Sequence, residues 1–324
     1  MRDEVLVVGG GVSGLTTAVV LAEAGWPVRL VSDRPPERTT SAVAGALWEP
    51  YLAEPRERVA RWAFATLPTL VALAERPAET GARMVEGVKA QRTPEPVPPW
   101  WLPQLPDALR PLAPDEVPRG YRSGYAATMP LLDMPTYLAY LVRRLAAAGG
   151  RIERRRLNSL AEAEEETALL VNCSGLGAAE LVPDREVRPI QGQLVVVENP
   201  GVDRWLVAEP TDGEENVYFF PQPAGLVLGG TALRDRWETE PDPALAARIV
   251  ARCAEIHPAI ADARVLEHRV GLRPARPSVR LDAGPGRNGR TLVVHNYGHG
   301  GCGVTVSWAC AREAAALLSA PRHR

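Results

Sequence analysis

A glycine-rich turn near the N-terminus constrains the fold more than any other feature of the chain. Residues 5–8 form a short apolar run, the turn at residues 9–14 has the spacing G-x-G-x-x-G, and a helical pattern follows at residues 13–24. A second short strand pattern occupies residues 28–31. Strand, glycine turn, helix and strand in this order are typical of a βαβ unit that binds a dinucleotide.

Each glycine of the turn has a physical role in such a unit. Gly9 makes the tight turn, Gly11 lets the backbone approach a pyrophosphate, and Gly14 allows the helix to pack closely on the strand. The start of the helix supplies free N–H groups and a partial positive charge for the phosphates. Asp33 follows the second strand, where a carboxylate can accept ribose hydroxyls, although a loop cap is an alternative role. The motif does not distinguish FAD from NAD.

Apolar runs and helical patterns divide the 324 residues into alternating regions. Mixed strand and helix patterns occur at both ends and in the middle, at residues 5–31, 135–172 and 292–318, and near-alternating strands lie between residues 193 and 228. This organisation is typical of the α/β class. It predicts a doubly wound nucleotide-binding domain assembled from three separated segments, with a mixed-sheet domain inserted.

Composition and charge exclude several classes of protein. With 46% hydrophobic residues the chain can bury a large core, and a formal net charge of −2 offers no basic surplus for nucleic acid or an anionic membrane. The four cysteines are widely spaced, as in a protein of a reducing compartment. No segment is typical of a signal peptide, a membrane span or a C-terminal address. We therefore expect a cytoplasmic protein without nucleic-acid or membrane partners, and a homodimer stays open.

A second glycine-rich loop lies between a strand and a helix near the C-terminus. Residues 295–305 read His-Asn-Tyr-Gly-His-Gly-Gly-Cys-Gly-Val-Thr, a composition that allows close approach to a flat cofactor ring at a helix start. His295 and His299 are four residues apart, but the glycines around them argue against a helix and so against a zinc-binding pair. We expect no metal site.

The same loop carries a family resemblance. The run at residues 295–301 resembles the C-terminal signature of the D-amino-acid oxidase family. The resemblance covers nearly the whole chain through further stretches at residues 7–15, 33–34, 39–41, 45–51, 171–175, 191–193, 218–221 and 271–277. It implies an FAD-binding Rossmann-like doubly wound domain (residues 1–55, 131–183 and 280–324) and an inserted mixed-sheet α+β substrate-binding domain (residues 56–130 and 184–279).

The resemblance also implies non-covalent FAD and the residues that would hold it. The ADP portion would contact Gly9, Gly11, Val12, Ser13, Gly14, Asp33, Arg34, Ser174 and Gly175. Thr39 and Thr40 would follow the pyrophosphate or ribityl chain, and Ala46 and Leu47 would face the N5 and O4 edge of the flavin. Arg273 would also reach the cofactor. The N1 and O2 side would meet Gly298, Gly300, Gly301, Gly303, Val304 and Thr305.

Three residues carry the chemistry that the resemblance implies. Arg273 would bind a substrate carboxylate with its planar fork, and the hydroxyl of Tyr218 would donate to the same carboxylate. The carbonyl of Gly301 would accept a hydrogen bond from the substrate amine, while Trp48 and Glu49 would line the pocket. By residue type alone, Arg273 could be a surface charge and Tyr218 a core aromatic residue.

The implied reaction is the oxidative deamination of a D-amino acid. The substrate Cα–H leaves as a hydride for flavin N5, and the resulting imine hydrolyses to a 2-oxo acid and ammonia. Molecular oxygen then reoxidises the flavin and yields hydrogen peroxide. The protein supplies orientation and desolvation, without a general base at the carbon.

Departures from the family pattern bear on the substrate. Glu214 stands where many members have a second tyrosine, in a short loop at residues 207–216 that also carries Glu209, Asp212 and Glu215. Glu49 replaces a common glutamine. These carboxylates favour neutral, or else basic, D-amino acids over D-aspartate and D-glutamate. Ala232 stands where D-aspartate oxidases have an arginine, although Arg234 could reach a side-chain carboxylate in its place.

Three alternatives remain at this point. The chain could be a D-aspartate oxidase. It could be a glycine- or sarcosine-type amine oxidase, in which Cys302 or Cys310 would be candidates for a covalent flavin link. It could also be a non-catalytic protein that binds FAD or NAD.

Overall fold

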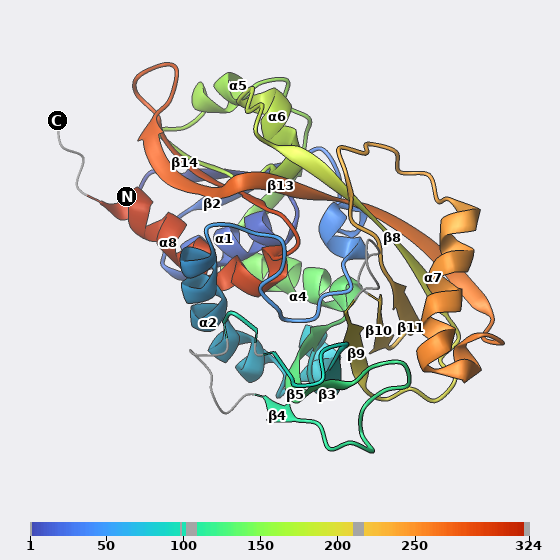
Figure 1. Ribbon diagram of the computed structural model, residues 1–324. Coiled ribbons are helices and arrows are strands. Elements are labelled where there is room, and N and C mark those ends of the chain that lie inside the picture. Colours follow the sequence, from blue (N-terminus) through green and yellow to red (C-terminus); the bar gives the residue numbers. More distant parts are fainter. Residues whose placement is uncertain (1, 98, 102–108, 210–216, 321–324) are drawn as a thin grey trace. The chain divides into compact units, whose positions relative to one another are not determined.

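The apolar runs form strands where the sequence predicts them. The structure, a computed structural model, describes residues 2–97, 99–101, 109–209 and 217–320. The chain forms two compact units. The first comprises Met1–Ala82, Met134–Pro189 and Arg273–Arg324, and the second comprises Arg83–Asp133 and Ile190–Leu272. The elements of both units are drawn in Figure 1 and confirm the α/β class.

A parallel sheet forms the centre of the first unit. Its strands are β1 (Val5–Val8), β2 (Val28–Ser32), β6 (Arg151–Arg154), β7 (Leu169–Asn172) and β14 (Leu292–His299). They lie in the order β14-β7-β1-β2-β6, and every neighbouring pair is parallel. The long strand β13 (Val265–Pro285) pairs antiparallel with β14. All residues of β1 and β7 are buried, as expected for strands covered on both faces.

Helices cover both faces of this sheet, which makes the first unit doubly wound. On one side lie α1 (Val12–Glu23), α4 (Met134–Ala147) and α8 (Gly303–Ser319), with α1 packed against both of the others (Figure 1). On the other side lie α5 (Leu160–Glu164) and α6 (Ala178–Leu181). Apolar side chains of β1 and β2 pack against α5. The expected Rossmann-like arrangement is confirmed.

Helix α2 (Arg56–Leu73) also belongs to the first unit, together with the short α3 (Pro77–Thr80). It packs against α8, where the indole of Trp62 donates to Glu313 at 2.6 Å and the hydroxyl of Thr66 accepts from the amide of Ala309 at 3.0 Å. The first unit therefore extends to residue 82, beyond the expected boundary at residue 55. It also includes residues 184–189 and 273–279. The ligand that each unit binds stays a prediction.

The second unit contains a mixed sheet. Its strands lie in the order β4 (Arg110–Pro111), β5 (Ser123–Leu132), β3 (Ala82–Gln91), β9 (Trp205–Ala208), β10 (Val217–Gln222), β11 (Gly225–Gly229) and β8 (Arg188–Val197). The pair β3–β9 is parallel, whereas β9–β10, β10–β11 and β11–β8 are antiparallel. Helix α7 (Pro243–Ile256) packs on β10 and β11, and the two-residue β12 (Leu233–Arg234) pairs with β8. In the described parts of both units, no helix has the length and apolar character that a membrane crossing needs.

Gly14 provides a test of the turn on which the first unit is built. A Cβ atom at Gly14 would lie 1.9 Å from the carbonyl oxygen of Gly9, so Gly14→Ala must push α1 away from β1. We expect a loss of about 2 kcal/mol or more in the free energy of unfolding and weaker FAD retention, measured by thermal melting and by visible absorbance. Gly284→Ala is the matched control, because a Cβ there would have no atom within 4 Å. Equal stability of the two variants would contradict the packing argument.

Candidate functional site

Four of the sequence-predicted segments meet at one edge of the parallel sheet. Gly9 follows β1, Asp33 follows β2 and Ser174 lies two residues after β7. Strand β14 ends at His299, and Gly300 follows it. Because these strands are parallel, their carboxyl ends lie at the same edge. Ligands of doubly wound folds bind outside the carboxyl ends of the strands. The candidate cofactor site is therefore this edge.

The first glycine turn is packed backbone against backbone. Gly9 has a φ of +117°, and a Cβ there would lie 2.4 Å from the carbonyl oxygen of Cys173 at the end of β7. Gly11 caps α1 and has no side chain to bond the free amides of the first turn. Apart from the amide of Val12, which donates to the hydroxyl of Ser41, the backbone of this helix start is therefore accessible to an anion.

Ser41 is a site residue that the sequence reasoning missed. Its hydroxyl accepts from the amide of Val12 at 2.9 Å, and a Cβ at Gly11 would lie 3.0 Å from the same oxygen. Ser41 belongs to the 3₁₀ turn η2 (Thr40–Val43), so this turn lies directly on the start of α1. The hydroxyl of Thr39 donates to the carbonyl of Pro36 at 2.7 Å. The sequence signal for Ser41 was the tripeptide at residues 39–41, in which only Thr39 and Thr40 were predicted to contact the cofactor.

Asp33 and Arg34 leave β2 as an exposed charged pair. The Nε atom of Arg34 lies 3.6 Å from Oδ2 of Asp33, and more than half of each side chain is exposed. An exposed carboxylate beside the glycine turn is available to accept ribose hydroxyls. The contacts of both residues with a cofactor stay a prediction.

Ser174 offers a direct test of whether the residues at this edge fit a dinucleotide. Its Oγ atom is buried and has no hydrogen-bond partner in the described chain. A buried hydroxyl without a partner costs free energy unless a ligand or water satisfies it. The neighbouring Gly175 has a φ of +57° and turns the chain there. An unsatisfied hydroxyl, a free helix start and an exposed carboxylate at one edge fit FAD.

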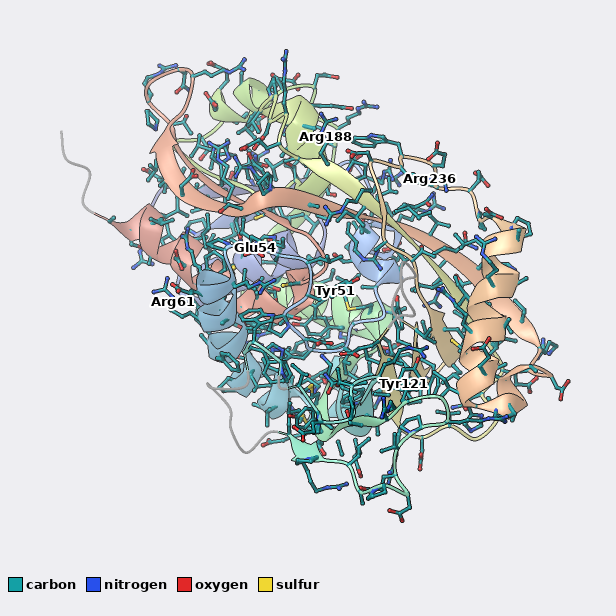
Figure 2. The ribbon with its side chains drawn as sticks, viewed as in Figure 1. Tyr51, Glu54, Arg61, Tyr121, Arg188 and Arg236 are labelled. Atoms are coloured by element: carbon teal, nitrogen blue, oxygen red, sulfur yellow. The ribbon has the colours of Figure 1, made fainter. Side chains whose placement is uncertain are left out.

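The second glycine loop is shorter than the sequence predicts, because β14 continues through His299. Gly300 and Gly301 then pack against the segment that precedes α2: a Cβ at Gly300 would lie 1.9 Å from the carbonyl oxygen of Leu52, and one at Gly301 would lie 2.6 Å from the ring of Tyr51. Figure 2 labels Tyr51 and Glu54 in this segment. The loop therefore presents backbone rather than side chains at the start of α8.

The start of α8 is hydrogen-bonded to the segment at residues 46–49, which carries the predicted flavin contacts Ala46 and Leu47. The hydroxyl of Thr305 donates to the carbonyl of Glu49 at 3.0 Å, and the same hydroxyl accepts from the amide of Glu49 at 3.3 Å. Ala46 is buried and has a φ of +59°, a backbone conformation that residues other than glycine rarely adopt. Leu47 follows it. The structure thus brings Ala46 and Leu47 into one locally connected region with the helix start at Gly303 and Val304.

The two histidines of the signature lie within hydrogen-bond distance of asparagine side chains inside the protein. His299 Nε2 lies 3.0 Å from Oδ1 of Asn296, and Nδ1 of His295 lies 3.3 Å from Nδ2 of Asn172. Burial lowers the pKa of both imidazoles to about 4, so both are neutral near pH 7. Asn296 also connects β14 to α1, since its carbonyl accepts from the hydroxyl of Ser13 at 3.2 Å. The described residues contain no group of three or more His, Cys, Asp or Glu placed to hold a metal ion.

Arg273 and Gly301 lie close together along the backbone of the first unit. Ala275 of β13 pairs with His299 of β14, and the amide of Gly300 donates to the carbonyl of Pro274 at 2.9 Å. Arg273 directly precedes Pro274 and is half-buried. The ladder therefore places the predicted carboxylate-binding arginine beside the loop whose carbonyl is predicted to bind the amine.

Tyr218 belongs to the second unit, and its approach to Arg273 stays a prediction. Its ring stacks on Phe220 with 4.8 Å between centroids and 15° between planes. A Cβ at Gly229 would lie 2.1 Å from the ring, so the glycine pair at residues 229–230 leaves space for it. The side chain is half-buried, which keeps a substrate role available.

Trp48 is buried in the first unit, and its role as a pocket wall stays a prediction. Only 1% of Trp48 is exposed; its indole donates to the carbonyl of Ala63 at 3.3 Å and its ring meets Phe64 edge to face. Glu49 is half-buried. Of the acidic loop, Asp212, Glu214 and Glu215 lie outside the described residues. The carboxylate of Glu209 accepts from the side chain of Gln91 at 3.2 Å and from the amide of Arg92 at 3.1 Å.

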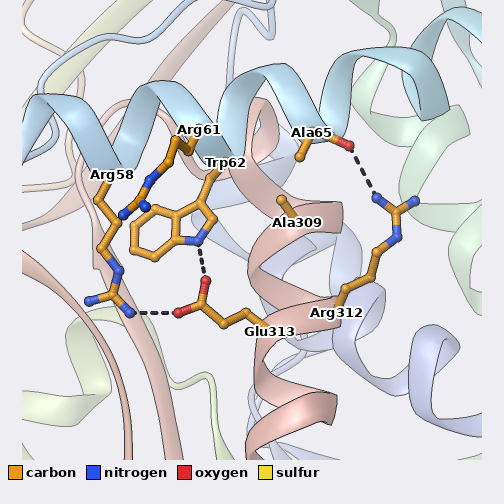
Figure 3. A pocket seen from close by; sticks show the side chains of 7 residues that line it. All are labelled: Arg58, Arg61, Trp62, Ala65, Ala309, Arg312 and Glu313. Carbon is orange, nitrogen blue, oxygen red and sulfur yellow. Dashed lines mark hydrogen bonds and ion pairs between the residues drawn. The ribbon is translucent and has the colours of Figure 1, made fainter.

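A shallow depression of about 410 Å³ between α2 and α8 is a separate feature (Figure 3). Three of its charged side chains pair within the protein: Arg58 donates to Glu313 at 2.7 Å, and Arg312 donates to the carbonyl of Ala65 at 3.1 Å. The α8 residues of the depression lie well past the helix start at Gly303. These interactions join two helices, and the depression does not belong to the cofactor site.

A doubly wound unit with two glycine-rich helix starts at one sheet edge is the architecture of a dinucleotide-binding protein, a class that includes the flavin-dependent oxidoreductases. Residues 4–317 match the family described as "DAO: FAD dependent oxidoreductase". The chain belongs to this family, and its cofactor is FAD.

Curated relatives and solved structures agree with this assignment. The chain is 56% identical to a D-amino-acid oxidase of Streptomyces coelicolor over 98% of both chains. It is 50% identical to a D-amino-acid oxidase of Rubrobacter xylanophilus, over 97% of this chain and 95% of the relative. Among solved structures, glycine oxidase from Geobacillus kaustophilus matches with a TM-score of 0.81 at 19% identity, over 98% of this chain and 95% of that chain. This last likeness concerns the fold.

The lowered pKa of His299 predicts a pH dependence of stability. In the unfolded chain the imidazole binds a proton near pH 6.5, whereas in the folded chain it does so only near pH 4. The unfolded state therefore binds more protons between these values, and about 3 kcal/mol of stability is lost as pH falls from 6.5 to 4. His299→Gln should flatten this slope in thermal melts, whereas a Gln replacement of the exposed His268 should keep it. An unchanged slope in His299→Gln would show that the imidazole is not buried neutral.

Proposed function

We propose that this chain oxidises D-amino acids to 2-oxo acids and ammonia, with molecular oxygen as electron acceptor and hydrogen peroxide as product. The observation that carries the proposal is the position of Arg273, whose strand pairs with β14 directly beside the glycine loop. The two D-amino-acid oxidases that are 56% and 50% identical to nearly the whole chain support it. A cytoplasmic location stays a prediction.

The proposed roles follow from the chemistry of the side chains. The guanidinium of Arg273 binds the substrate carboxylate with two parallel hydrogen bonds, and Tyr218 donates a further one. The carbonyl of Gly301 accepts from the amine, so the substrate is held at two ends and its Cα–H has one orientation. The start of α8 lacks a side-chain cap and favours negative charge nearby. FAD, when bound, accepts the two electrons of the oxidation and passes them to oxygen.

The histidines of the signature have no proton-transfer role in this proposal. His295 and His299 are 9% and 4% exposed, and the imidazole of each lies within hydrogen-bond distance of an asparagine side chain. Their low pKa leaves them neutral under working conditions. Orientation and exclusion of water therefore account for the chain's contribution.

A glycine- or sarcosine-type oxidase with covalent flavin is less well supported. Cys302 is 0% exposed and Cys310 is 1% exposed. Burial raises the pKa of the Cys302 thiol to about 12, which opposes formation of a reactive thiolate. Yellow colour in the supernatant after acid precipitation supports non-covalent FAD.

Arg273→Ala tests the proposed function. The substrate carboxylate loses its charged partner in a desolvated site, so we expect kcat/KM for D-alanine to fall about a thousandfold, or about 4 kcal/mol. FAD retention and melting temperature should stay near wild type. Arg61→Ala, an exposed arginine on α2, is the matched control (Figure 2). Wild-type kcat/KM in Arg273→Ala would refute the assignment.

Substrate preference tests the finer proposal of neutral, or else basic, D-amino acids. Glu49 lies next to the α8 start, Ala232 offers no cation, and Arg234 is exposed on β12. An acidic substrate side chain would therefore lack a buried partner. We expect kcat/KM for D-alanine, D-valine or D-lysine to exceed that for D-aspartate at least tenfold, measured by peroxide formation with glycine and sarcosine in parallel. A tenfold lead of D-aspartate would favour the D-aspartate oxidase alternative, with Arg234 as its first candidate.

A further inference from the structure

Strand β13 contains an irregularity close to Arg273. Ala275 pairs with His299 and Arg280 pairs with Tyr297, so the stretch at residues 276–279 of β13 faces the single residue Gly298 of β14. Gly298 has a φ of +83°, and a Cβ there would lie 2.9 Å from the Cβ of Arg276. This is a β-bulge, a feature that often re-aims side chains next to active sites.

A buried carboxylate joins the two ends of this bulge. Oδ2 of Asp184 lies 3.1 Å from Nε of Arg276 and 3.8 Å from Nη1 of Arg280. The hydroxyl of Tyr297 donates to the same oxygen at 2.7 Å and accepts from Arg280 at 2.8 Å. Only 6% of the Asp184 side chain is exposed. One oxygen atom thus connects both arginines of β13 with the strand β14.

The bulge itself has few other anchors. Arg276 donates to the carbonyl of Ser278 at 2.9 Å and pairs with Glu186, and the amide of Val279 donates to the carbonyl of Glu54 at 2.7 Å. Burial acts to raise the pKa of Asp184, but the hydrogen bonds from Tyr297, Glu186 and Arg276 outweigh it and the pKa is lowered. The carboxylate is therefore ionised near pH 7 and attracts both guanidinium groups.

The bulge determines the register that brings Arg273 to the glycine loop. The pairing of Ala275 with His299 and the hydrogen bond from Gly300 to Pro274 both lie on the Arg273 side of the bulge. A slip of one residue in a strand turns every side chain to the opposite face. Without a fixed bulge, Arg273 would lose its defined direction.

We propose that Asp184 is a positioning residue for substrate binding: it clamps both ends of the β13 bulge and thereby holds Arg273 in the register that binds the substrate carboxylate. The inference rests on the proposed role of Arg273. It also gives a reason for a buried charge at this position, since buried ion pairs contribute little net stability and their best-attested use is to fix register.

The test is a double-mutant cycle measured on the FAD-loaded enzyme. Asp184→Asn keeps the shape of the side chain but removes its charge, and we expect KM for D-alanine to rise tenfold or more while kcat changes less than threefold. Binding of benzoate, used as a simple carboxylate and followed by the flavin spectrum, should weaken by a similar factor. In an Arg273→Ala background, Asp184→Asn should have no further effect on rapid flavin reduction by D-alanine, because its target is already absent.

Matched variants separate positioning from a general loss of structure. Asp282→Asn removes an exposed carboxylate that lies 3.3 Å from Arg280 on the same strand, and it should leave KM within twofold of wild type. If Asp184→Asn does not fold, Tyr297→Phe removes the hydrogen bond to the same oxygen together with the one that Tyr297 accepts from Arg280. It leaves the charge of Asp184 in place and should show a smaller rise in KM that again vanishes in the Arg273→Ala background. Asp184→Glu, which keeps the charge, should recover part of the affinity.

The outcomes distinguish this inference from the proposed function. A multiplicative effect of Asp184→Asn and Arg273→Ala, or an unchanged KM and benzoate affinity in Asp184→Asn, would overturn the positioning role while leaving the oxidase assignment intact. If instead Arg273→Ala alone retains wild-type kcat/KM, the proposed function itself fails.

Discussion

Close contact between backbones at Gly9 and Gly14 is the constraint on which the first unit depends. With no Cβ on either residue, the end of β1, the start of α1 and the end of β7 lie within contact distance of one another. The consequence is chemical as well as structural, because the start of α1, where Ser41 accepts from the amide of Val12, lies at the edge where the strands end and favours negative charge nearby. A larger residue would separate helix from sheet and remove the place where the pyrophosphate of FAD can approach.

The second glycine loop also allows close backbone packing at a helix start, here that of α8, but its contacts come from other residues. Gly300 and Gly301 pack against residues 51 and 52, and the side chain of Thr305 holds the backbone of Glu49. Asn296 of the signature connects β14 with α1. The neutral His299 lies within hydrogen-bond distance of Asn296, and His295 lies within hydrogen-bond distance of Asn172 on β7. The side chains of the signature at residues 295–301 therefore mainly hold backbone atoms in place. They also fix β14, the strand that pairs with the strand carrying Arg273.

Much of the fold could be predicted because its strands are short apolar runs between strong turn signals. Helix α4 and strand β7 occupy the two ends of the region at residues 135–172 in which a mixed strand and helix pattern is predicted. The end of β14 was predicted too early, since the glycines and polar residues after His295 are typical of a loop. In the folded chain Asn296 and His299 find partners inside the protein, and the strand continues to His299. The first compact unit also continues past residue 55, because α2 packs on α8, and the assignment of FAD and substrate to the two domains stays a prediction.

The sequence by itself determined the class of fold, the two glycine loops and a dinucleotide site, because glycine spacing is a local requirement of the backbone and is visible in one dimension. FAD rather than NAD followed from the family resemblance of residues 295–301. Tertiary structure decided what depends on partners distant in the chain. It placed Trp48 in the core, made Ser41 the cap of α1 and left the hydroxyl of Ser174 without a partner at the cofactor edge. It also brought Asp184 to two arginines nearly a hundred residues away. A carboxylate among many in a sequence acquires a role only when folding removes its water and supplies its counter-charges.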